Sequence, residues 1–326
     1  MSADAKVLIA PDDFKGTYTA PDVAGALARG LRAGGVEAIE LPVADGGNGT
    51  MTAVVAALDG DERSAQVTDP LGRPIEAHFG LLPDGTTAVV EMAQASGLAL
   101  LSEDERDPWE ASTRGTGELM MAAVEAGAQT IIVAVGGSAT TDGGRGAVEV
   151  LHEAQIEPEI VVACDVRVKY EDCPRVFGPQ KGADEAMIAR LEQRLDEWAG
   201  GAPRDPRGRE MTGAAGGLSG GLWAYLGARL VPGAPYVLDM VRFDDRMREA
   251  SFVVTGEGKL DEQTLTGKAV FEVATRCRQG GLACHAVVGT RELDDFQVRT
   301  IDLASVREAT TLEELEAAGR AIAGGD

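Results

Sequence analysis

Residues 131–147 read IIVAVGGSATTDGGRGA, and this stretch decides the class of fold. Its first five residues are apolar and have the length of a buried strand. Glycines, small hydroxyls and one carboxylate, Asp142, follow directly. In open α/β sheets ligands bind beyond the carboxyl ends of the strands, where exposed backbone N–H groups can hold phosphate oxygens. The stretch therefore predicts an α/β fold with a ligand-binding loop after this strand.

Three further glycine loops also follow apolar runs that resemble buried strands. One such loop is weak evidence, because tight turns need glycine in any case. Four loops that also carry lysines and carboxylates favour a shared site at the carboxyl edge of a sheet. None of them ends as a Walker A sequence does, and no segment matches the dinucleotide-binding fingerprint. The other three loops read PDDFKG (11–16), ADGGNGT (44–50) and TGEGKLDEQTLTGK (255–268).

Both ends of the chain alternate strands with helices, which predicts a parallel sheet. A helix over 19–33 opens with a capping box of Thr19 and Asp22, and the last helix opens with a capping box of Thr311 and Glu314. The remaining elements are predicted from apolar runs and stripes. They are strands at 7–10, 39–43, 252–254, 283–288 and 301–306, and helices at 50–58 and 267–279.

The middle of the chain has a different residue pattern, without the regular alternation of strands and helices. Residues 63–92 predict short strands joined by turns, and residues 185–198 predict an amphipathic helix. Residues 199–221 are rich in glycine, proline and arginine. They predict a long functional loop, with disorder as the alternative.

The composition is that of a globular protein, with 44% hydrophobic and 25% charged residues in a chain of 326. No apolar run approaches the roughly 18 residues of a membrane span, so no membrane partner is expected. The N-terminal residues have no apolar stretch like that of a signal peptide. We therefore expect a cytoplasmic protein with reduced thiols. The cysteine spacing fits neither a zinc site nor a redox pair: Cys164, Cys173, Cys277 and Cys284.

The formal net charge of −23 excludes nucleic acid as a partner. A small anionic substrate is still compatible with this charge where basic groups gather locally. The acidic excess is typical of proteins from a salt-rich cytoplasm, whereas a GC-rich genome explains only the preference for arginine. Both explanations stay open. Of the six lysines, four are next to a glycine: Lys15, Lys181, Lys259 and Lys268.

Eight motifs in order along the chain resemble the type 1 glycerate kinase family. They extend over about residues 7 to 290, nearly the whole sequence. Where the family usually has glutamate and asparagine, this chain has Asn48 and Thr141, and residues 167–173 also depart from its pattern. The motifs are PDDFKGTYTA, LPVADGGNGT, VEMAQASGL, GGSATTDGG, ACDV, FGPQKGA, GAAGGLSGGL and TGEGKLDEQTLTGK.

The resemblance implies ATP-dependent phosphorylation of D-glycerate, usually on its 2-hydroxyl group. It also implies a flavodoxin-like domain with a parallel five-stranded sheet, built from residues 1–60 and 245–326. A mixed α/β domain, residues 61–244, is inserted between these two segments. A kinase for a related small sugar acid is the nearest alternative. The sequence does not fix the oligomeric state.

Phosphoryl transfer needs cations around the moving group and a side chain that accepts the hydroxyl proton. Asp45 ends the second strand beside two glycines and is the preferred base or hydroxyl ligand, with Asp12 next. Lys15 is a candidate catalytic cation. The residues predicted to bind ATP are Gly136, Gly137, Ser138, Thr140, Lys181, Gly256 and Gly258.

ATP and Mg²⁺ are the expected cofactors. Magnesium needs one or two carboxylates besides phosphate oxygens and water. Glu257 and Asp261 are the candidate ligands, with Asp165 as a further one. Glu257 or Asp261 could instead cap a helix.

Two rival functions come from other classes of protein. Residues 217–221, GLSGG, match the nucleophile elbow of serine hydrolases, and His285 follows in the right order. That elbow must leave a strand, and the preceding residues are polar and glycine rich. A non-catalytic protein that binds sugar acids is the second rival, but it would need no carboxylates for a metal.

Overall fold

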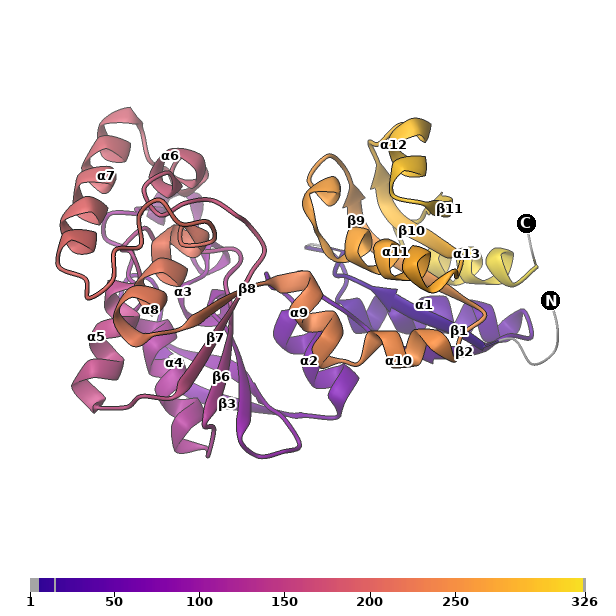
Figure 1. The fold of residues 1–326 in the computed structure, drawn as a ribbon, viewed down its shortest axis with the longest axis horizontal. Helices are drawn as coiled ribbons and strands as arrows, with labels where there is room; N and C mark the ends of the chain where they lie inside the picture. The colour runs from indigo at the N-terminus through magenta and orange to yellow at the C-terminus, as the bar shows by residue number, and fades with distance from the viewer. Residues whose placement is uncertain (1–5, 15, 325–326) are drawn as a thin grey trace. The chain divides into compact units, whose positions relative to one another are not determined.

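The chain, seen in a computed structural model, forms two compact units, each described on its own below (Figure 1). The structure describes residues 6–14 and 16–324, so Lys15 lies outside the described residues. Unit 1 consists of Met1–Asp45, Thr52–Leu58 and Ala234–Asp326. Unit 2 consists of Gly46–Met51 and Asp59–Gly233. The domain boundaries at 60/61 and 244/245 stay a prediction, and the units differ from them at 46–51, 59–60 and 234–244.

Unit 1 is built on a parallel sheet of five strands in the order β11-β10-β9-β1-β2. Counted along the chain within the unit, this is the flavodoxin-like order 2-1-3-4-5. The α/β fold and the five-stranded sheet from both chain ends are therefore confirmed. The strands are β1 (Lys6–Pro11), β2 (Glu37–Glu40), β9 (Phe252–Leu260), β10 (Cys284–Arg291) and β11 (Leu303–Glu308).

Alternate residues of β1 point to opposite faces of this sheet, and each face has its own core. Val7 and Ile9 pack with α1 (Ala20–Ala33) and α13 (Leu312–Gly324). Leu8 and Ala10 pack with the other helices of the unit. Those helices are α2 (Thr50–Leu58), which starts in unit 2, and α9 (Gly233–Met240), α10 (Phe243–Arg248), α11 (Ala269–Gly280) and α12 (Asp295–Thr300).

Helices α1 and α13 approach so closely that glycine is required where they cross. A Cβ atom at Gly30 would lie 2.0 Å from the carbonyl oxygen of Glu316. The predicted capping box of Thr19 and Asp22 is present at the start of α1. At the start of α13, Thr311 accepts the N–H of Glu314 as predicted, but the Glu314 carboxylate accepts the N–H of Thr310.

Unit 2 has a mixed sheet of six strands in sequence order. The first three form an antiparallel meander, as the turn-rich segment 63–92 predicted, and the rest are parallel. The strands are β3 (Asp61–Thr68), β4 (Pro74–Leu81), β5 (Thr87–Glu91), β6 (Thr130–Ala134), β7 (Glu159–Cys164) and β8 (Arg229–Pro232). The helices are α3 (Ala93–Ser96), α4 (Arg114–Glu125), α5 (Arg145–Ala154), α6 (Cys173–Phe177), α7 (Glu185–Gly200) and α8 (Leu218–Leu226).

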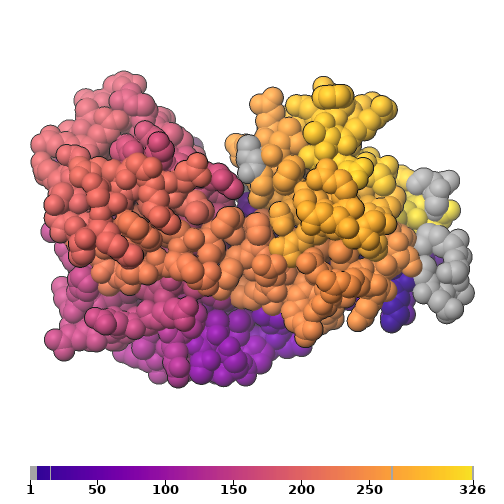
Figure 2. Space-filling model, viewed as in Figure 1, coloured from indigo at the N-terminus to yellow at the C-terminus, as the bar shows by residue number. Residues whose placement is uncertain are grey.

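The segment 199–221 was predicted as a loop throughout, and this is wrong at both ends, because α7 continues to Gly200. Residues 214–217 form a 3₁₀ turn and residues from 218 onward form α8. The earlier part of the segment is mostly exposed and contributes to the face of the molecule in Figure 2, where it is red. Glycine-rich sequence becomes helical here because Gly220 and Gly221 pack against Tyr170 and Gly143, where a Cβ would clash.

Two further boundaries differ from the prediction. β9 continues through TGEGKL to Leu260, so the first half of the expected loop 255–268 is strand. Gly256 lies in register with Pro11 and Val287, and a Cβ there would meet the Val287 carbonyl at 2.2 Å. Its glycine is therefore explained by strand packing. β2 ends at Glu40, although Leu41 and Val43 still donate backbone hydrogen bonds to β1.

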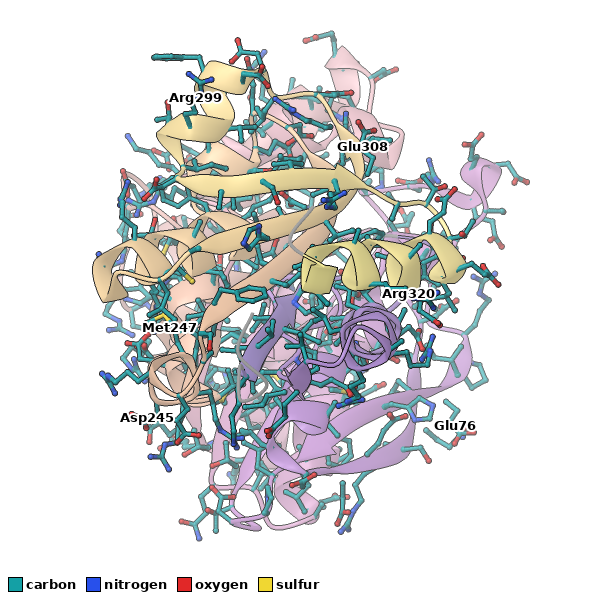
Figure 3. All side chains as sticks on the ribbon, turned by 90° about the vertical axis from the view of Figure 1, so that its right-hand side faces the viewer. Glu76, Asp245, Met247, Arg299, Glu308 and Arg320 are labelled. Atoms are coloured by element: carbon teal, nitrogen blue, oxygen red, sulfur yellow. The ribbon has the colours of Figure 1, made fainter. Side chains whose placement is uncertain are left out.

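Two helices of unit 1 carry exposed ion pairs between neighbouring residues. On α13, Arg320 pairs with Glu316, and on α10, Asp245 pairs with Arg242 and Arg248 (Figure 3). All four cysteines are buried and unpaired. Within the described part of the chain, every helix falls short of the length and apolar character that crossing a membrane requires.

Candidate active site

Unit 1 has a pocket of about 490 Å³ at the carboxyl ends of β1, β9 and β10. This is where a parallel α/β sheet binds its ligands. The pocket brings together parts of the first and fourth glycine loops of the sequence, as predicted. Its lining includes carboxylates, lysines and hydroxyls: Asp12, Asp13, Phe14, Thr17, Glu257, Gly258, Lys259, Asp261, Gln263, Lys268, Gly289, Thr290 and Thr310.

Glu257 is the most strongly perturbed carboxylate of this pocket. It is only 5% exposed, and its Oε1 accepts a hydrogen bond of 2.6 Å from the Thr264 hydroxyl. Burial raises the pKa of Glu257 to about 7, and the charges of Asp45 and Asp261 add to the rise. Thr264 and Lys268 act in the opposite direction. A buried carboxyl with a shifted pKa in a pocket is a typical feature of functional sites.

Asp261 lies beside Glu257, because Thr264 links the two. The Asp261 N–H donates to the same Thr264 hydroxyl, and Asp261 Oδ1 accepts the N–H of Gln263. Lys259 extends from the strand on the same wall, with its ammonium 2.9 Å from Glu292 and 3.7 Å from Asp261. Lys268 is the N-cap residue of α11 and makes no side-chain capping bond. The N-terminus of this helix therefore faces the pocket without a cap from its N-cap residue.

The three predicted catalytic residues have different places. Asp12 ends β1 and lines the pocket. Asp45 is 2% exposed and acts electrostatically on Glu257, but it is not part of the pocket lining. Lys15 cannot be placed, since it lies outside the described residues. Asp13, which the sequence did not single out, accepts the Ala20 N–H at the start of α1 at 2.6 Å.

The glycine loop at residues 135–144 lies in unit 2, between β6 and α5. The Asp142 carboxylate of this loop accepts hydrogen bonds from the protein itself. Its Oδ2 accepts the N–H and the hydroxyl of Thr113, both at 2.8 Å, and the N–H of Gly146. Its Oδ1 accepts the N–H of Gly144, and Thr113 in turn accepts the N–H of Ala147. The first N–H groups of α5 are thus bound by side chains of the protein.

Lys181 lies buried beneath the same loop. Its ammonium donates to the Ser138 hydroxyl at 2.8 Å and to the Thr140 carbonyl at 2.6 Å. Burial lowers its pKa to about 8, although nearby Cys173 and Asp142 raise it. Among the described residues no carboxylate forms an ion pair with it. Lys181 therefore carries a buried charge whose contacts are neutral oxygens of the loop.

A second pocket, of about 110 Å³, opens beside this loop within unit 2. Gly136 and Gly137 form one side, and the segment 46–49 packs against them. A Cβ at Gly137 would come within 2.6 Å of the Asn48 side chain, and Val135 donates its N–H to Gly46. The second and third glycine loops therefore meet here. The lining residues are Val135, Gly136, Gly137, Ser138, Asp165, Val166, Phe177, Gln180 and Ala215.

Glu91 holds the second glycine loop in place and was missed as a functional candidate. It is buried at the end of β5, and its carboxylate accepts the N–H of Gly49 at 3.0 Å and of Met51 at 3.3 Å. These are the first N–H groups of α2. The only indication of its role in the sequence was its position in the motif VEMAQASGL.

Arg194 was also missed, because an arginine on an amphipathic helix does not by itself indicate a functional role. It donates to the carbonyls of Thr141 and Trp109.

The predicted magnesium ligands are divided between the two units. Glu257 and Asp261 line the pocket of unit 1, whereas Asp165 lines the pocket of unit 2. In the part of the chain that the structure describes, no group of three or more histidine, cysteine, aspartate or glutamate side chains gathers as a metal site would. The pair Glu257 and Asp261, which line one pocket, is compatible with a shared magnesium ion, which needs one or two protein carboxylates.

The hydrolase alternative is wrong. GLSGG leads into α8 rather than leaving a strand, and Ser219 is buried, with its hydroxyl donating to the Met211 carbonyl at 2.6 Å. His285 lies in β10 with Nδ1 2.8 Å from the Ser305 hydroxyl. The departure at 167–173 also has a packing role, because Tyr170 and Cys173 are buried with Leu195.

The pocket of unit 1 combines carboxylates and lysines at the edge of a parallel sheet, and it borders a helix whose N-cap residue, Lys268, makes no side-chain capping bond. Such groups are typical of enzymes that handle phosphates. The sequence matches the Glycerate kinase family over residues 7–156 and 148–321. It is 39% identical to Glycerate 2-kinase of Escherichia coli over 308 residues, 82% of this chain and 81% of that protein. The chain belongs to the glycerate kinase family and is an enzyme of the kinase class.

Two further similar proteins support the assignment to the glycerate kinase family. Glycerate kinase of Bacillus subtilis is 38% identical over 332 residues, 90% of this chain and 87% of that protein. The crystal structure of a protein assigned as glycerate kinase 2 of Salmonella typhimurium LT2 matches with a TM-score of 0.86 at 32% identity. That match covers 99% of this chain and 98% of the other.

Proposed function

We propose that this enzyme transfers the terminal phosphoryl group of ATP to the 2-hydroxyl of D-glycerate. The observation that carries the proposal is the similarity to Glycerate 2-kinase of Escherichia coli over about four fifths of both chains. The choice of the 2-hydroxyl rests on the name of that relative. The pocket of unit 1 adds chemical support, because it offers cations and carboxylates at one sheet edge.

Asp45 is proposed as the group that accepts the proton of the substrate hydroxyl, with Asp12 as the alternative. Asp45 is buried next to Glu257, and Asp12 lines the pocket itself. Lys15 is proposed as a cation for the moving phosphoryl group, on sequence grounds alone. The loop residues Gly136, Gly137, Ser138 and Thr140, with Lys181 behind them, are proposed to hold a substrate.

Glu257 and Asp261 fit the proposed Mg²⁺ ion. They share Thr264 and line one pocket, and burial makes the negative charge of Glu257 costly unless a cation is near. When bound, the ion would neutralise charge on the phosphates of ATP. The residues of the chain supply the rest: Lys259 and Lys268 attract phosphates, and Thr264 fixes the orientation of the Glu257 carboxylate.

The enzyme is proposed to act in the cytoplasm, where ATP is available and its four free thiols stay reduced. The net charge of −23 gives it no affinity for nucleic acids. Its proposed partners are therefore two small anions, ATP and glycerate.

An assay with Mg·ATP and D-glycerate, coupled to detection of ADP, tests the proposed function. Phosphorus NMR of the product then identifies the position, because a phosphate on the 2-carbon couples to one proton and a phosphate on the 3-carbon to two. We expect ADP release and a doublet. ADP release only with another small sugar acid, or a triplet with glycerate, would overturn the substrate or the position.

A further inference from the structure

The pockets at the glycine loops of unit 1 and unit 2 differ in size. The pocket of unit 1 has a volume of about 490 Å³, within the range of roughly 300–1,000 Å³ that drug-sized ligands occupy. The pocket of unit 2 has about 110 Å³, well below that range. A nucleotide is a drug-sized ligand, whereas a three-carbon acid is much smaller. Of the two pockets at the glycine loops, the one in unit 1 therefore matches the nucleotide better in size. Unit 2 has a further pocket of about 350 Å³, at His152 and Tyr225, but no residue of the glycine loops lines it.

Helix termini support the same division. Phosphates bind where the first N–H groups of a helix are open. At α5, which follows the glycine loop of unit 2, Asp142 and Thr113 already accept those N–H groups. A phosphate at this helix would also meet the negative charge of Asp142. At α11, which borders the pocket of unit 1, the N-cap residue is Lys268 and makes no capping bond.

The pocket of unit 2 has the chemistry of a small hydroxy acid site. Lys181 is 1% exposed, and its charge has no carboxylate partner among the described residues. A buried charge is costly unless it is compensated, and a carboxylate bound at Ser138 would compensate it. Gly136 and Gly137 line the same pocket, while Asp165 and Gln180 can bind hydroxyl groups.

We propose that the unit 2 pocket, formed by Gly136, Gly137, Ser138, Asp165 and Gln180, binds glycerate, and that the unit 1 pocket binds the nucleotide. This assignment rests on the proposed function. It replaces the sequence-based prediction that the loop 136–140 and Lys181 bind ATP. Lys181 becomes a positioning residue, which holds Ser138 and Thr140 and supplies positive charge behind them.

Two matched charge substitutions test the assignment. Gln180 and Gln263 are both exposed, and each lines one pocket. Gln180→Glu and Gln263→Glu add the same charge without changing the size of the side chain. Gln66→Glu, on the exposed face of β3 outside both pockets, controls for net charge. Melting curves verify that all three variants fold.

The measurements are the KM for D-glycerate at saturating ATP and the calorimetric Kd for ADP without added metal. Like charges a few ångströms apart near a protein surface weaken binding by about tenfold or more. We expect Gln180→Glu to raise the KM for glycerate about tenfold and to leave the Kd for ADP within about twofold of wild type. Gln263→Glu should show the reverse, and Gln66→Glu should change neither constant.

A reversed pattern, or a glycerate KM that Gln180→Glu leaves unchanged, would overturn the assignment. These outcomes are distinct from failure of the proposed function. If the wild-type enzyme does not phosphorylate glycerate, the function fails before any variant is compared. If it does, only the assignment of the pockets is at stake.

Discussion

Two glycine-rich segments of this enzyme look alike in sequence, but the helices that follow them differ in which groups bind their first backbone N–H groups. Residues 135–144 lead from β6 into α5, and residues 255–268 include the end of β9 and lead into α11. At α5, the Asp142 carboxylate and the Thr113 hydroxyl bind the first N–H groups. At α11, the N-cap residue is a lysine without a capping bond. Side chains of the protein bind the start of the first helix, whereas the N-cap residue of the second makes no such bond.

The comparison extends to the other two glycine loops. The Ala20 N–H of α1 is bound by Asp13, and the first N–H groups of α2 are bound by Glu91. Three of the four helices therefore begin at a carboxylate of the chain itself.

The glycines of the two segments are also required for different reasons. At Gly143 a Cβ would lie 2.1 Å from the Tyr170 hydroxyl, and at Gly256 it would meet β10. A glycine-rich loop is thus no proof of a phosphate site.

The largest expected effect is that of Asp45→Asn, which tests whether the reacting groups belong to unit 1. The side chain keeps its size, so the fold should persist. If Asp45 accepts the hydroxyl proton, kcat should fall by roughly 10²–10⁴. Steady-state kinetics at saturating substrates, together with a melting curve, provide the measurement. A kcat within a few-fold of wild type would show that Asp45 is only a turn residue and does not accept the proton.

The same substitution in the other segment, Asp142→Asn, should act on stability rather than on chemistry. An amide replaces one acceptor oxygen by a donor, so at least one of the bound N–H or O–H groups loses its partner. Each buried donor left unsatisfied costs about 1–3 kcal/mol. We expect unfolding by denaturant to show a loss of about 2–4 kcal/mol, with kcat changed less than tenfold. A stable variant with a much lower kcat would show that Asp142 faces the reaction after all.

Glu257→Gln sharpens the comparison through pH. Burial raises the pKa of Glu257 from 4.5 to about 7, so the folded state binds more protons than the unfolded state between these values. The stability that Glu257 contributes when protonated is therefore lost as pH rises through 7. The glutamine variant carries no such charge and still accepts the Thr264 hydroxyl. It should be more stable than wild type by about 2–3 kcal/mol at pH 8, and nearly equal at pH 5.

Denaturant unfolding at both pH values without divalent metal is the measurement. Asp261→Asn is the matched control, because the Asp261 side chain is more exposed and lines the same pocket. A stability difference that is the same at pH 5 and pH 8 would contradict the buried charge. The gain at pH 8 should coincide with loss of activity, since residues kept at a cost in stability are often functional.

Much of the fold could be predicted from the sequence. The alternation of apolar runs and capping boxes located β1, α1 and α2, and the turn signals located the meander of β3 to β5. The end of β9 could not be located, because Gly256 and Gly258 resemble loop residues. Only their contacts with β10 show them to be strand. Likewise the glycines of 213–221 gave no helical signal, because their fit against Tyr170 is a tertiary property.

The site was less predictable than the fold, for a reason of the same kind. Sequence identified polar residues at strand ends, but it could not distinguish a carboxylate that faces a ligand from one that caps a helix. Asp142 and Glu257 both follow an apolar run in the sequence and are next to glycine. Four donors nevertheless satisfy the Asp142 carboxylate, whereas a single hydroxyl donates to that of Glu257. Partners such as Thr113 and Glu91 come from distant parts of the chain.

The smallest expected effect comes from closing the open helix with Lys268→Ser. Serine is a favourable N-cap residue, and a new capping bond should stabilise the enzyme by about 0.5–1 kcal/mol. The same change removes a cation from the pocket and occupies an N–H group that a phosphate would use, so the Kd for ADP should rise several-fold while the KM for glycerate changes less than twofold. Thr290→Ser, which removes one methyl group from the same pocket, should leave both constants near wild type. If Lys268→Ser stabilises the protein but leaves ADP binding intact, the start of α11 does not hold phosphate. The difference in N-terminal capping between α5 and α11 would then concern the stability of the two helices and not the binding of a ligand.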